Sequence, residues 1–318
     1  MKIDSIRPKR IMRFANIAYE EDVSFYLENA YRFTERFCPG CSNATSDVYL
    51  RHREFNFSRC QACWTVFMNP GPTQALVGEF YEQSHVYKYW SEHVYPETQE
   101  TRRNKLSVPR AEVIDQALLG HIGELTLAEI GAGTGDVLFE IKKKYPHAGV
   151  IAVEPNPDMW PSYVNQNIKL YKSGYEVALQ ELHDLDLVCA FEVLEHLLEP
   201  LEFFQKCSRA LKKGGKLVCS TPNAASIELQ ALMGKSNTVD IEHISILTPA
   251  ALHRLACETG FSIDFIKTPG EFDLELLSRE SAFLRAIRTF PPFSLSKLQE
   301  KISRYGLSSH MKFVMTKI

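Results

Sequence analysis

The sequence predicts an α/β protein built on a doubly wound, mostly parallel β-sheet. From Leu125 onward, short apolar runs alternate with amphipathic helical segments at the spacing of β-α-β units. A glycine-rich turn follows the first of these runs, as expected where a strand leads into a helix. Two cysteine pairs lie far upstream and indicate a separate small module ahead of the sheet.

Seven strands are predicted in this sheet. Five apolar runs form its parallel part, at residues 125–130, 149–153, 168–171, 185–190 and 216–220. Helices are predicted at 136–144, 157–167, 201–211 and 249–259. Two later runs, 261–267 and 311–316, are predicted to close the sheet as a hairpin-like pair. The stretch between them, about 271–308, contains Pro291-Pro292 and is interpreted as an insertion with helical character.

Three regions are predicted along the chain. Residues 1–72 hold an N-terminal segment and the cysteine module, which ends at the breaker Asn69-Pro70-Gly71-Pro72. Residues 73–122 are predicted to be helical and to form a cap or linker. Residues 123–318 hold the α/β domain with its insertion.

Composition excludes several classes of protein. The chain has 318 residues, is 45% hydrophobic and carries a formal net charge of -3, which is typical of a folded protein without a basic field. No apolar run reaches the roughly 18 residues of a membrane span. The basic N-terminus is not followed by an apolar run and a cleavage site, so no secretory signal is expected. We therefore expect a soluble, cytoplasmic protein, and the acidic net charge disfavours nucleic acid as a partner. Its oligomeric state is not predicted.

The cysteine module is predicted to bind a structural zinc ion. Cys38 and Cys41 form one C-x-x-C pair and Cys60 and Cys63 form another, with eighteen residues between the pairs. Two such pairs can direct four thiolates at one Zn²⁺, as in a zinc ribbon. Four protein ligands leave no open position for water, so the ion would stabilise a small fold. The alternatives are unrelated reduced thiols or a redox pair.

The glycine loop and an acidic partner predict a nucleoside site. Gly131, Gly133 and Gly135 follow a predicted strand and open a helix, in the pattern G-x-G-x-G. Glu154 stands at the tip of the next strand, where a carboxylate can accept hydrogen bonds from both hydroxyls of a ribose.

The chain resembles class I S-adenosylmethionine-dependent methyltransferases over about residues 125–270. The segments that carry the resemblance are Glu129–Asp136, Glu154-Pro155, Phe191–Leu197, Leu211–Leu217, Glu242-His243 and Leu247–Pro249. They are most similar to ubiquinone-biosynthesis O-methyltransferases. The cysteine pairs, Asn69-Pro70 and the Tyr-rich segment also resemble a bacterial subgroup with an N-terminal zinc module, often associated with saccharide or secondary-metabolite tailoring.

The resemblance implies a Rossmann-like methyltransferase fold that binds S-adenosyl-L-methionine. Glu154 would hold the ribose, while Phe191 and Glu192 would lie beside the methionine portion. The full set of cofactor contacts that we expect is Glu129, Gly131, Ala132, Gly133, Gly135, Glu154, Pro155, Phe191, Glu192, Tyr81 and Tyr89. Between Tyr171 and Tyr175 there is no carboxylate for the adenine, so that contact is left open.

Methyl transfer requires a base only if the acceptor must lose a proton, as an alcohol does. His243 is the first candidate, because it is expected in a loop over the methyl group and histidine titrates near neutral pH. The alternative is a loop histidine that only shapes the site. His196 is the second candidate, expected one helical turn after Glu192, and its alternative is a structural histidine. Glu242 is interpreted as a solvated or site-shaping charge.

An aromatic cluster precedes the sheet and has two interpretations. It comprises Phe80, Tyr81, Tyr87, Tyr89, Trp90 and Tyr95. These rings could cover the sulfonium, since aromatic faces attract cations, or could pack a helical cap onto the core. The basic residues Arg102, Arg103, Lys105 and Arg110 could grip a phosphorylated substrate or form a solvated helix face.

Three functions are compatible with these patterns. A methyltransferase acting on a small-molecule acceptor is favoured, with O-methylation as the first expectation and a saccharide or secondary metabolite as the acceptor. An RNA methyltransferase that holds RNA with its zinc module is the second. A non-catalytic protein that binds the cofactor and a partner is the third.

Overall fold

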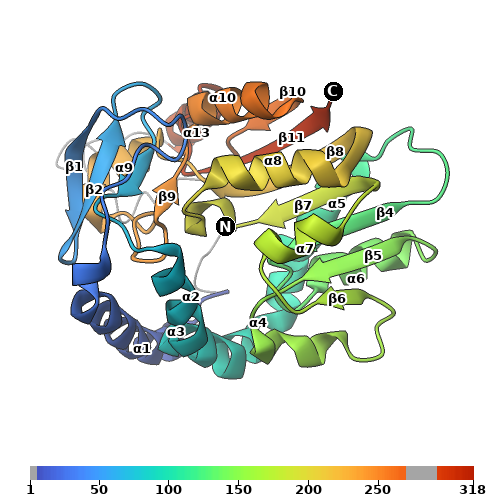
Figure 1. Ribbon diagram of the computed structural model, residues 1–318, viewed down its shortest axis with the longest axis horizontal. Helices are drawn as coiled ribbons and strands as arrows, with labels where there is room; N and C mark the ends of the chain where they lie inside the picture. The colour runs from blue at the N-terminus through green and yellow to red at the C-terminus, as the bar shows by residue number, and fades with distance from the viewer. Residues whose placement is uncertain (1–5, 270–291) are drawn as a thin grey trace.

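The computed structural model describes residues 6–269 and 292–318 of the chain. The larger sheet has seven strands in the order β10-β11-β8-β7-β4-β5-β6 (Figure 1). Its strands are β4 (Thr126–Ile130), β5 (Gly149–Val153), β6 (Lys169–Tyr171), β7 (Leu185–Phe191), β8 (Leu211–Pro222), β10 (Phe261–Lys267) and β11 (His310–Lys317). The strands from β8 to β6 are parallel, whereas β11 runs antiparallel to both β8 and β10. The predicted seven-stranded, mostly parallel sheet with a closing hairpin-like pair is confirmed.

Helices cover both faces of this sheet. On one face lie α7 (Tyr175–Glu181), α8 (Pro200–Ala210) and α10 (Pro249–Thr259), which pack against Ala128, Val188 and Ala190. On the other face α5 (Val108–Ala117) and α6 (Asp136–Lys144) pack against Leu127 and Leu187. Neighbouring residues of one strand thus enter opposite cores, as the two-residue period of a strand requires.

A smaller, four-stranded antiparallel sheet holds the cysteine module. Its order is β1-β2-β3-β9, with β1 (Ser46–His52), β2 (Phe55–Cys60), β3 (Val66–Met68) and β9 (Ser245–Ile246). The last strand comes from the region after β8, far along the chain, and pairs Ile246 with Val66. The four-stranded sheet is therefore completed by a strand from the α/β part of the chain.

The predicted cap is helical, as expected. Residues 73–122 form α2 (Gln74–Gln83), α3 (His85–Tyr89), α4 (Tyr95–Arg102) and two π-helical turns, η3 (Trp90–Val94) and η4 (Arg103–Ser107), which lead into α5. Helix α1 (Lys9–Glu28) precedes the cysteine module and contacts α3. In Figure 1 these elements run along the lower edge, from the four-stranded sheet to the seven-stranded one. They cross the region next to the carboxyl ends of the parallel strands, where ligands of such sheets bind.

Two local expectations are wrong. The helix expected at 157–167 is a short 3₁₀-helix, η5 (Pro157–Tyr163), because Pro161 lacks the backbone N–H that an α-helix would need there. Helix α7 was not predicted, and it begins directly after the Tyr171–Gly174 stretch. Between β7 and α8 the chain forms η6 (Leu194–His196), and after β8 it forms α9 (Ile227–Leu232) and η7 (Met233–Lys235). A 3₁₀-turn, η2 (Ala30–Arg32), follows α1.

The proposed insertion at 271–308 is only partly covered. Residues 270–291 lie outside the described residues, and the described remainder contains α13 (Pro292–Arg304). In the part of the chain that the structure covers, no helix is both long enough and apolar enough to pass through a bilayer.

Candidate functional site

The glycine loop lies between β4 and α6 and has three residues in the left-handed region. Gly131, Gly133 and Gly135 have φ angles of +67°, +54° and +80°. A Cβ at Gly131 would lie 2.7 Å from Cγ2 of Val193, whereas a Cβ at Gly133 would meet nothing within 4 Å. Glycine is thus required at both positions by conformation, and at Gly131 by packing as well. The space beside Gly133 is open to a ligand.

Glu154 holds this loop from the tip of β5. The buried carboxylate accepts a hydrogen bond from the backbone N–H of Gly133 at 2.7 Å and another from that of Asn156 at 2.8 Å. Burial raises the pKa of Glu154 above its ordinary value, although both backbone bonds oppose that shift. Each oxygen of a carboxylate has a second lone pair, so Glu154 can still accept hydrogen bonds from a ligand.

Glu129 lies next to the loop with an unpaired oxygen. Its side chain is 4% exposed, and Oε2 has no hydrogen-bond partner. Burial raises its pKa to about 8, with Arg110 opposing the shift and the charges of Asp136 and Glu154 adding to it. A buried polar atom without a partner is costly, so this oxygen marks a position where a ligand would find an acceptor.

Phe191 and Glu192 end β7 on the opposite side of the loop. Glu192 has a φ of +58°, and its carboxylate accepts a hydrogen bond from Ser220 Oγ at 2.6 Å and contacts His310 Nε2 at 3.1 Å. Burial alone would raise the pKa of Glu192, but His310, Arg110 and Ser220 lower it below its ordinary value. The Arg110 guanidinium lies 3.6 Å from Glu192 and 5.1 Å from the centre of the Phe191 ring.

The two histidines proposed as bases lie face to edge, with ring centres 5.0 Å apart. His243 Nδ1 is 2.8 Å from the carbonyl oxygen of Thr238, which can only accept, so Nδ1 carries the proton and Nε2 has a free lone pair. Burial and the adjacent His243 lower the pKa of His196 to about 3, and its Nδ1 has no partner. The fold brings these two rings together although they lie 47 positions apart in the chain.

The expected helical face shared by His196 and Glu192 is wrong. The positive φ of Glu192 ends the strand, and only a single 3₁₀-turn follows, so the two residues do not belong to one α-helix. Instead, Glu195 of this turn is buried and accepts a hydrogen bond from Thr221 Oγ1 at 2.9 Å. The ligand atoms of Glu195, His196 and His243 lie within 4.8 Å of one another. Burial raises the pKa of Glu195 and lowers that of His196, so it favours the neutral form of both side chains.

Glu242 lines the same region from the loop that carries His243. It is half-buried and accepts a hydrogen bond from Tyr87 Oη at 2.6 Å. Burial and the charge of Asp240 raise its pKa to about 8. The Tyr87 ring lies 5.2 Å from that of Tyr81, whose own pKa is raised by burial and by the carboxylates of Glu242, Glu195 and Glu154. The site-shaping interpretation of Glu242 agrees with these contacts.

The other four residues that we predicted to contact the cofactor lie in different surroundings. Ala132 is buried within the loop, and Pro155 is exposed just after Glu154. Tyr81 packs beside Phe80 and Tyr87, whereas Tyr89 donates a hydrogen bond to the carbonyl of Ile11 at 3.1 Å and packs on His93. Tyr89 is thus tied to the N-terminal helix, and Tyr81 lies beside the tyrosine that bonds Glu242.

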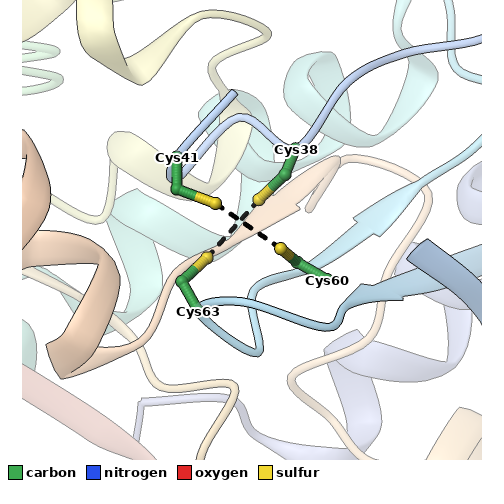
Figure 2. A group of neighbouring side chains, drawn as sticks. All are labelled: Cys38, Cys41, Cys60 and Cys63. Atoms are coloured by element: carbon green, nitrogen blue, oxygen red, sulfur yellow. Dashed lines mark hydrogen bonds between the residues drawn. The ribbon is translucent and has the colours of Figure 1, made fainter. Parts of the chain in front are cut away.

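The four paired cysteines converge on one point (Figure 2). The sulfurs of Cys38 and Cys63 are 3.5 Å apart, as are those of Cys41 and Cys60. Four sulfurs about 2.3 Å from a tetrahedral Zn²⁺ would be about 3.8 Å apart, so only a slight expansion is needed. Gly40 lies so near Thr65 and Ala251 that a Cβ would clash with both, which packs the first cysteine knuckle against α10. The donor set fits a structural zinc ion.

The roles of several residues at the site were not predicted from the sequence. Tyr163 donates a hydrogen bond to the carbonyl of Gly133 at 2.8 Å, and its ring would clash with a Cβ at Gly135. Arg110 is predicted only as a contact to a phosphorylated substrate or part of a solvated helix face, and no role is predicted for His310. His310 lies 118 positions from Glu192 and reaches it only because β11 pairs with β8. Its one sequence signal was its place next to the predicted last strand.

The comparison with protein families identifies the domain. The family model described as "Methyltransferase domain" matches residues 99–264, a span that includes the glycine loop, Glu154 and both histidines. The cysteine module lies outside this match.

Individual proteins agree with this result. A Mycolicibacterium smegmatis protein named "Probable S-adenosylmethionine-dependent methyltransferase" is 26% identical over 49% of this chain and 59% of its own length. An O-methyltransferase of ubiquinone biosynthesis from Maricaulis maris is 32% identical over 32% of this chain and 42% of its own length. The chain thus spans well under two thirds of either relative.

A solved structure has the same fold. The plantazolicin methyltransferase BpumL, in complex with a monoazolic desmethylPZN analog and SAH, has a TM-score of 0.50 at 15% identity, over 76% of this chain and 94% of BpumL. The chain therefore belongs to the methyltransferase domain family and has the fold of the class I S-adenosylmethionine-dependent enzymes.

Proposed function

We propose that this protein transfers a methyl group from S-adenosyl-L-methionine to a small-molecule acceptor, with oxygen as the favoured site of methylation. The observation that carries the proposal is the buried Glu154 carboxylate fastened to Gly133, with the His196–His243 pair beside the same strand ends. The matched relative from ubiquinone biosynthesis is named an O-methyltransferase, and so is a Paenibacillus relative that is 24% identical over 56% of this chain, named malonyl-[acyl-carrier protein] O-methyltransferase.

The chain's residues fit the cofactor's parts. When bound, S-adenosyl-L-methionine supplies a methyl group on a positively charged sulfur. Glu154 offers its free lone pairs to the ribose hydroxyls, and the open space beside Gly133 accommodates the ligand. Arg110 matches a carboxylate, and the unpaired Oε2 of Glu129 matches an ammonium group. Tyr81 packs on Tyr87, which bonds Glu242, and we propose that its ring faces the sulfonium, since aromatic faces attract cations.

His243 is the base in this proposal. Its Nδ1 proton is fixed on the carbonyl of Thr238, so Nε2 is the nitrogen that can accept the acceptor's proton. His196 stays neutral and packs against the His243 ring, which restrains its orientation. The protein's main contribution is alignment of acceptor and methyl group, and the base adds about 10²–10⁴-fold.

The cysteine module is proposed to hold a structural Zn²⁺ through Cys38, Cys41, Cys60 and Cys63. With four thiolates the ion has no free position for substrate, so its role is to hold the four-stranded sheet. Because β9 belongs to that sheet, the ion also supports the segment that follows His243.

The test uses the purified protein, a cell extract and S-adenosylmethionine with an isotopically labelled methyl group. Mass spectrometry should find the label in a small molecule; label in RNA alone would contradict the proposal. With that acceptor, His243→Ala should lower kcat by about 10²–10⁴-fold and leave S-adenosylhomocysteine binding unchanged. The control His121→Ala changes an exposed histidine and should leave kcat unchanged. Unchanged turnover of His243→Ala would remove His243 from the role of base.

A further inference from the structure

Two arginines share an aromatic ring at the edge of the site. The guanidinium carbon of Arg7 lies 5.3 Å from the centre of the Trp90 ring, and that of Arg102 lies 5.6 Å from the same ring. Arg102 is also 5.1 Å from the ring centre of Tyr95. We call Arg7 and Arg102 the arginine pair. Stacking on aromatic rings positions a guanidinium and leaves its N–H groups free to bind an anion.

Three neighbouring arginines have a carboxylate partner, but the arginine pair does not. Arg10 pairs with Glu97 at 2.7 Å, Arg103 with Glu140 at 2.6 Å, and Arg110 lies 3.6 Å from Glu192. Within residues 6–269 and 292–318, neither Arg7 nor Arg102 has a carboxylate at ion-pair distance or a hydrogen-bond acceptor. The local sequence therefore supplies counter-ions to the adjacent arginines and none to this pair.

This arrangement has an electrostatic cost in the free protein. Arg102 is half-buried, and burial together with the like charges of Arg110 and Arg7 lowers its pKa, although Tyr95 and Asp136 partly offset the shift. A like charge beside a half-buried guanidinium is unfavourable unless an opposite charge joins them. A bound anion would remove this cost, so the pair has the properties of a prepared anion site.

Tyr95 connects the arginine pair to the methyl-transfer site. Burial raises the pKa of Tyr95, the charges of Arg102 and Arg7 lower it, and those of Glu154 and Glu242 raise it. The charges of both groups thus act on the Tyr95 phenol group. Ser91, next to Trp90, donates a hydrogen bond to Asp158 at 3.3 Å, four positions after Glu154, so an anion on the arginine pair would lie near the strand end that carries Glu154.

We propose that Arg7 and Arg102 bind an oxyanion, phosphate or carboxylate, carried by the methyl acceptor. This inference rests on the proposed function and narrows its substrate class to anionic small molecules. The two guanidinium groups bind the oxyanion. The part of the molecule that receives the methyl group extends past Tyr95 toward His243. Arg110 stays on the cofactor's side of the site, next to Phe191 and Glu192.

The test is isothermal titration of the full-length protein already saturated with S-adenosylhomocysteine. Inorganic pyrophosphate is the probe in one arm and malonate in the other, so the two arms distinguish a phosphate from a carboxylate. One of these anions should bind, and Arg102→Gln or Arg7→Gln should weaken it about tenfold or more. The matched control is Arg103→Gln, which removes a neighbouring arginine that Glu140 already neutralises, and it should leave anion affinity unchanged.

Three outcomes would overturn the inference. They are no binding of either anion, equal binding by wild type and both pair variants, and a loss of S-adenosylhomocysteine affinity in Arg102→Gln that would assign this arginine to the cofactor. Arg7 is exposed, so Arg7→Gln keeps the test decisive if Arg102→Gln folds poorly. Failure of wild-type protein to bind S-adenosylhomocysteine would instead contradict the proposed function itself.

Discussion

Gly131 and Gly133 share a left-handed backbone but serve different purposes. Alanine at either position costs about 1–2 kcal/mol of backbone strain. At Gly131 the added methyl group would also lie 2.7 Å from Val193, so Gly131→Ala should lower the free energy of unfolding more than Gly133→Ala does. At Gly133 the methyl group enters open space, and we expect Gly133→Ala to weaken S-adenosylhomocysteine binding instead. Urea denaturation and isothermal titration measure the two effects.

Val193→Ala provides the control for this comparison. It should recover part of the stability lost in Gly131→Ala, because the smaller side chain removes the contact. It should have no such effect in the Gly133→Ala background. Equal stability of the two glycine variants would contradict the packing argument.

The raised pKa of Glu129 predicts that the free energy of unfolding depends on pH. Its pKa is about 8 in the folded protein against an ordinary 4.5, so between these values the folded state binds more protons than the unfolded state. Stability contributed by this group is therefore complete below about pH 4.5 and is lost as pH rises toward 8. In Glu129→Gln the group no longer titrates. The Tm of wild type minus that of Glu129→Gln, measured without ligand, should fall steadily across this range.

The control for Glu129 is Glu124→Gln, which changes an exposed carboxyl just ahead of β4. Its Tm should follow that of wild type at every pH. A difference between wild type and Glu129→Gln that stays constant with pH would show that the buried carboxyl does not hold its proton.

At the scale of elements, Arg36 joins the loops that carry the two histidines. Its guanidinium donates to the carbonyl of Leu198 at 2.6 Å and to that of Ile244 at 3.3 Å. Leu198 follows His196 by two positions, and Ile244 follows His243 directly. Burial lowers the pKa of Arg36 to about 10, so it remains charged at neutral pH. Arg36 thus fixes the spacing of η6 and β9 from the side of the cysteine module.

Arg36→Met should destabilise the protein by about 1–3 kcal/mol, because it leaves the carbonyl of the buried Leu198 without its donor. It should also lower kcat for the methyl acceptor, shift the pH profile of kcat and leave S-adenosylhomocysteine affinity unchanged. Arg36→Lys should restore part of kcat. The control is Arg32→Met, which breaks the half-exposed Arg32–Glu79 pair and should have little effect. Loss of stability with an unchanged pH profile would reduce Arg36 to a structural role.

The elements that sequence reasoning found are those with local signals. The parallel strands, the glycine loop and the cysteine pairs each occupy a continuous, recognisable stretch, and the structure confirms the sheet and the convergence of the cysteines. Arg36, His310 and strand β9 act through partners between 118 and 208 positions away, which no local pattern reveals. Helix α7 and the 3₁₀-turn at Pro157 were missed or misassigned because short helical segments have weak periodicity.

At the scale of the whole molecule, the site is assembled by both sheets. The family match covers residues 99–264, which include β9, whereas β1, β2 and β3 precede it. Thr248, at the start of α10, donates a hydrogen bond to the carbonyl of Cys63 at 2.6 Å, and Met68 N–H donates to Ile244 at 3.1 Å. The cysteine module therefore supports the histidine loop, while the glycine loop and Glu154 depend on the seven-stranded sheet.

Because the two sheets support different parts of the site, we predict that loss of zinc lowers kcat and leaves cofactor binding intact. Cys60→Ser removes one of four thiolates, so native mass spectrometry should find one Zn²⁺ on wild type and none on the variant, with a lower Tm. Because β9 begins two residues after His243, kcat should fall. S-adenosylhomocysteine affinity should hold within about twofold, because the glycine loop joins β4 and α6 of the seven-stranded sheet. Cys257→Ser, at an exposed cysteine outside the cluster, should match wild type throughout. A metal-free variant that kept full kcat would show that the histidine loop holds its position without the ion.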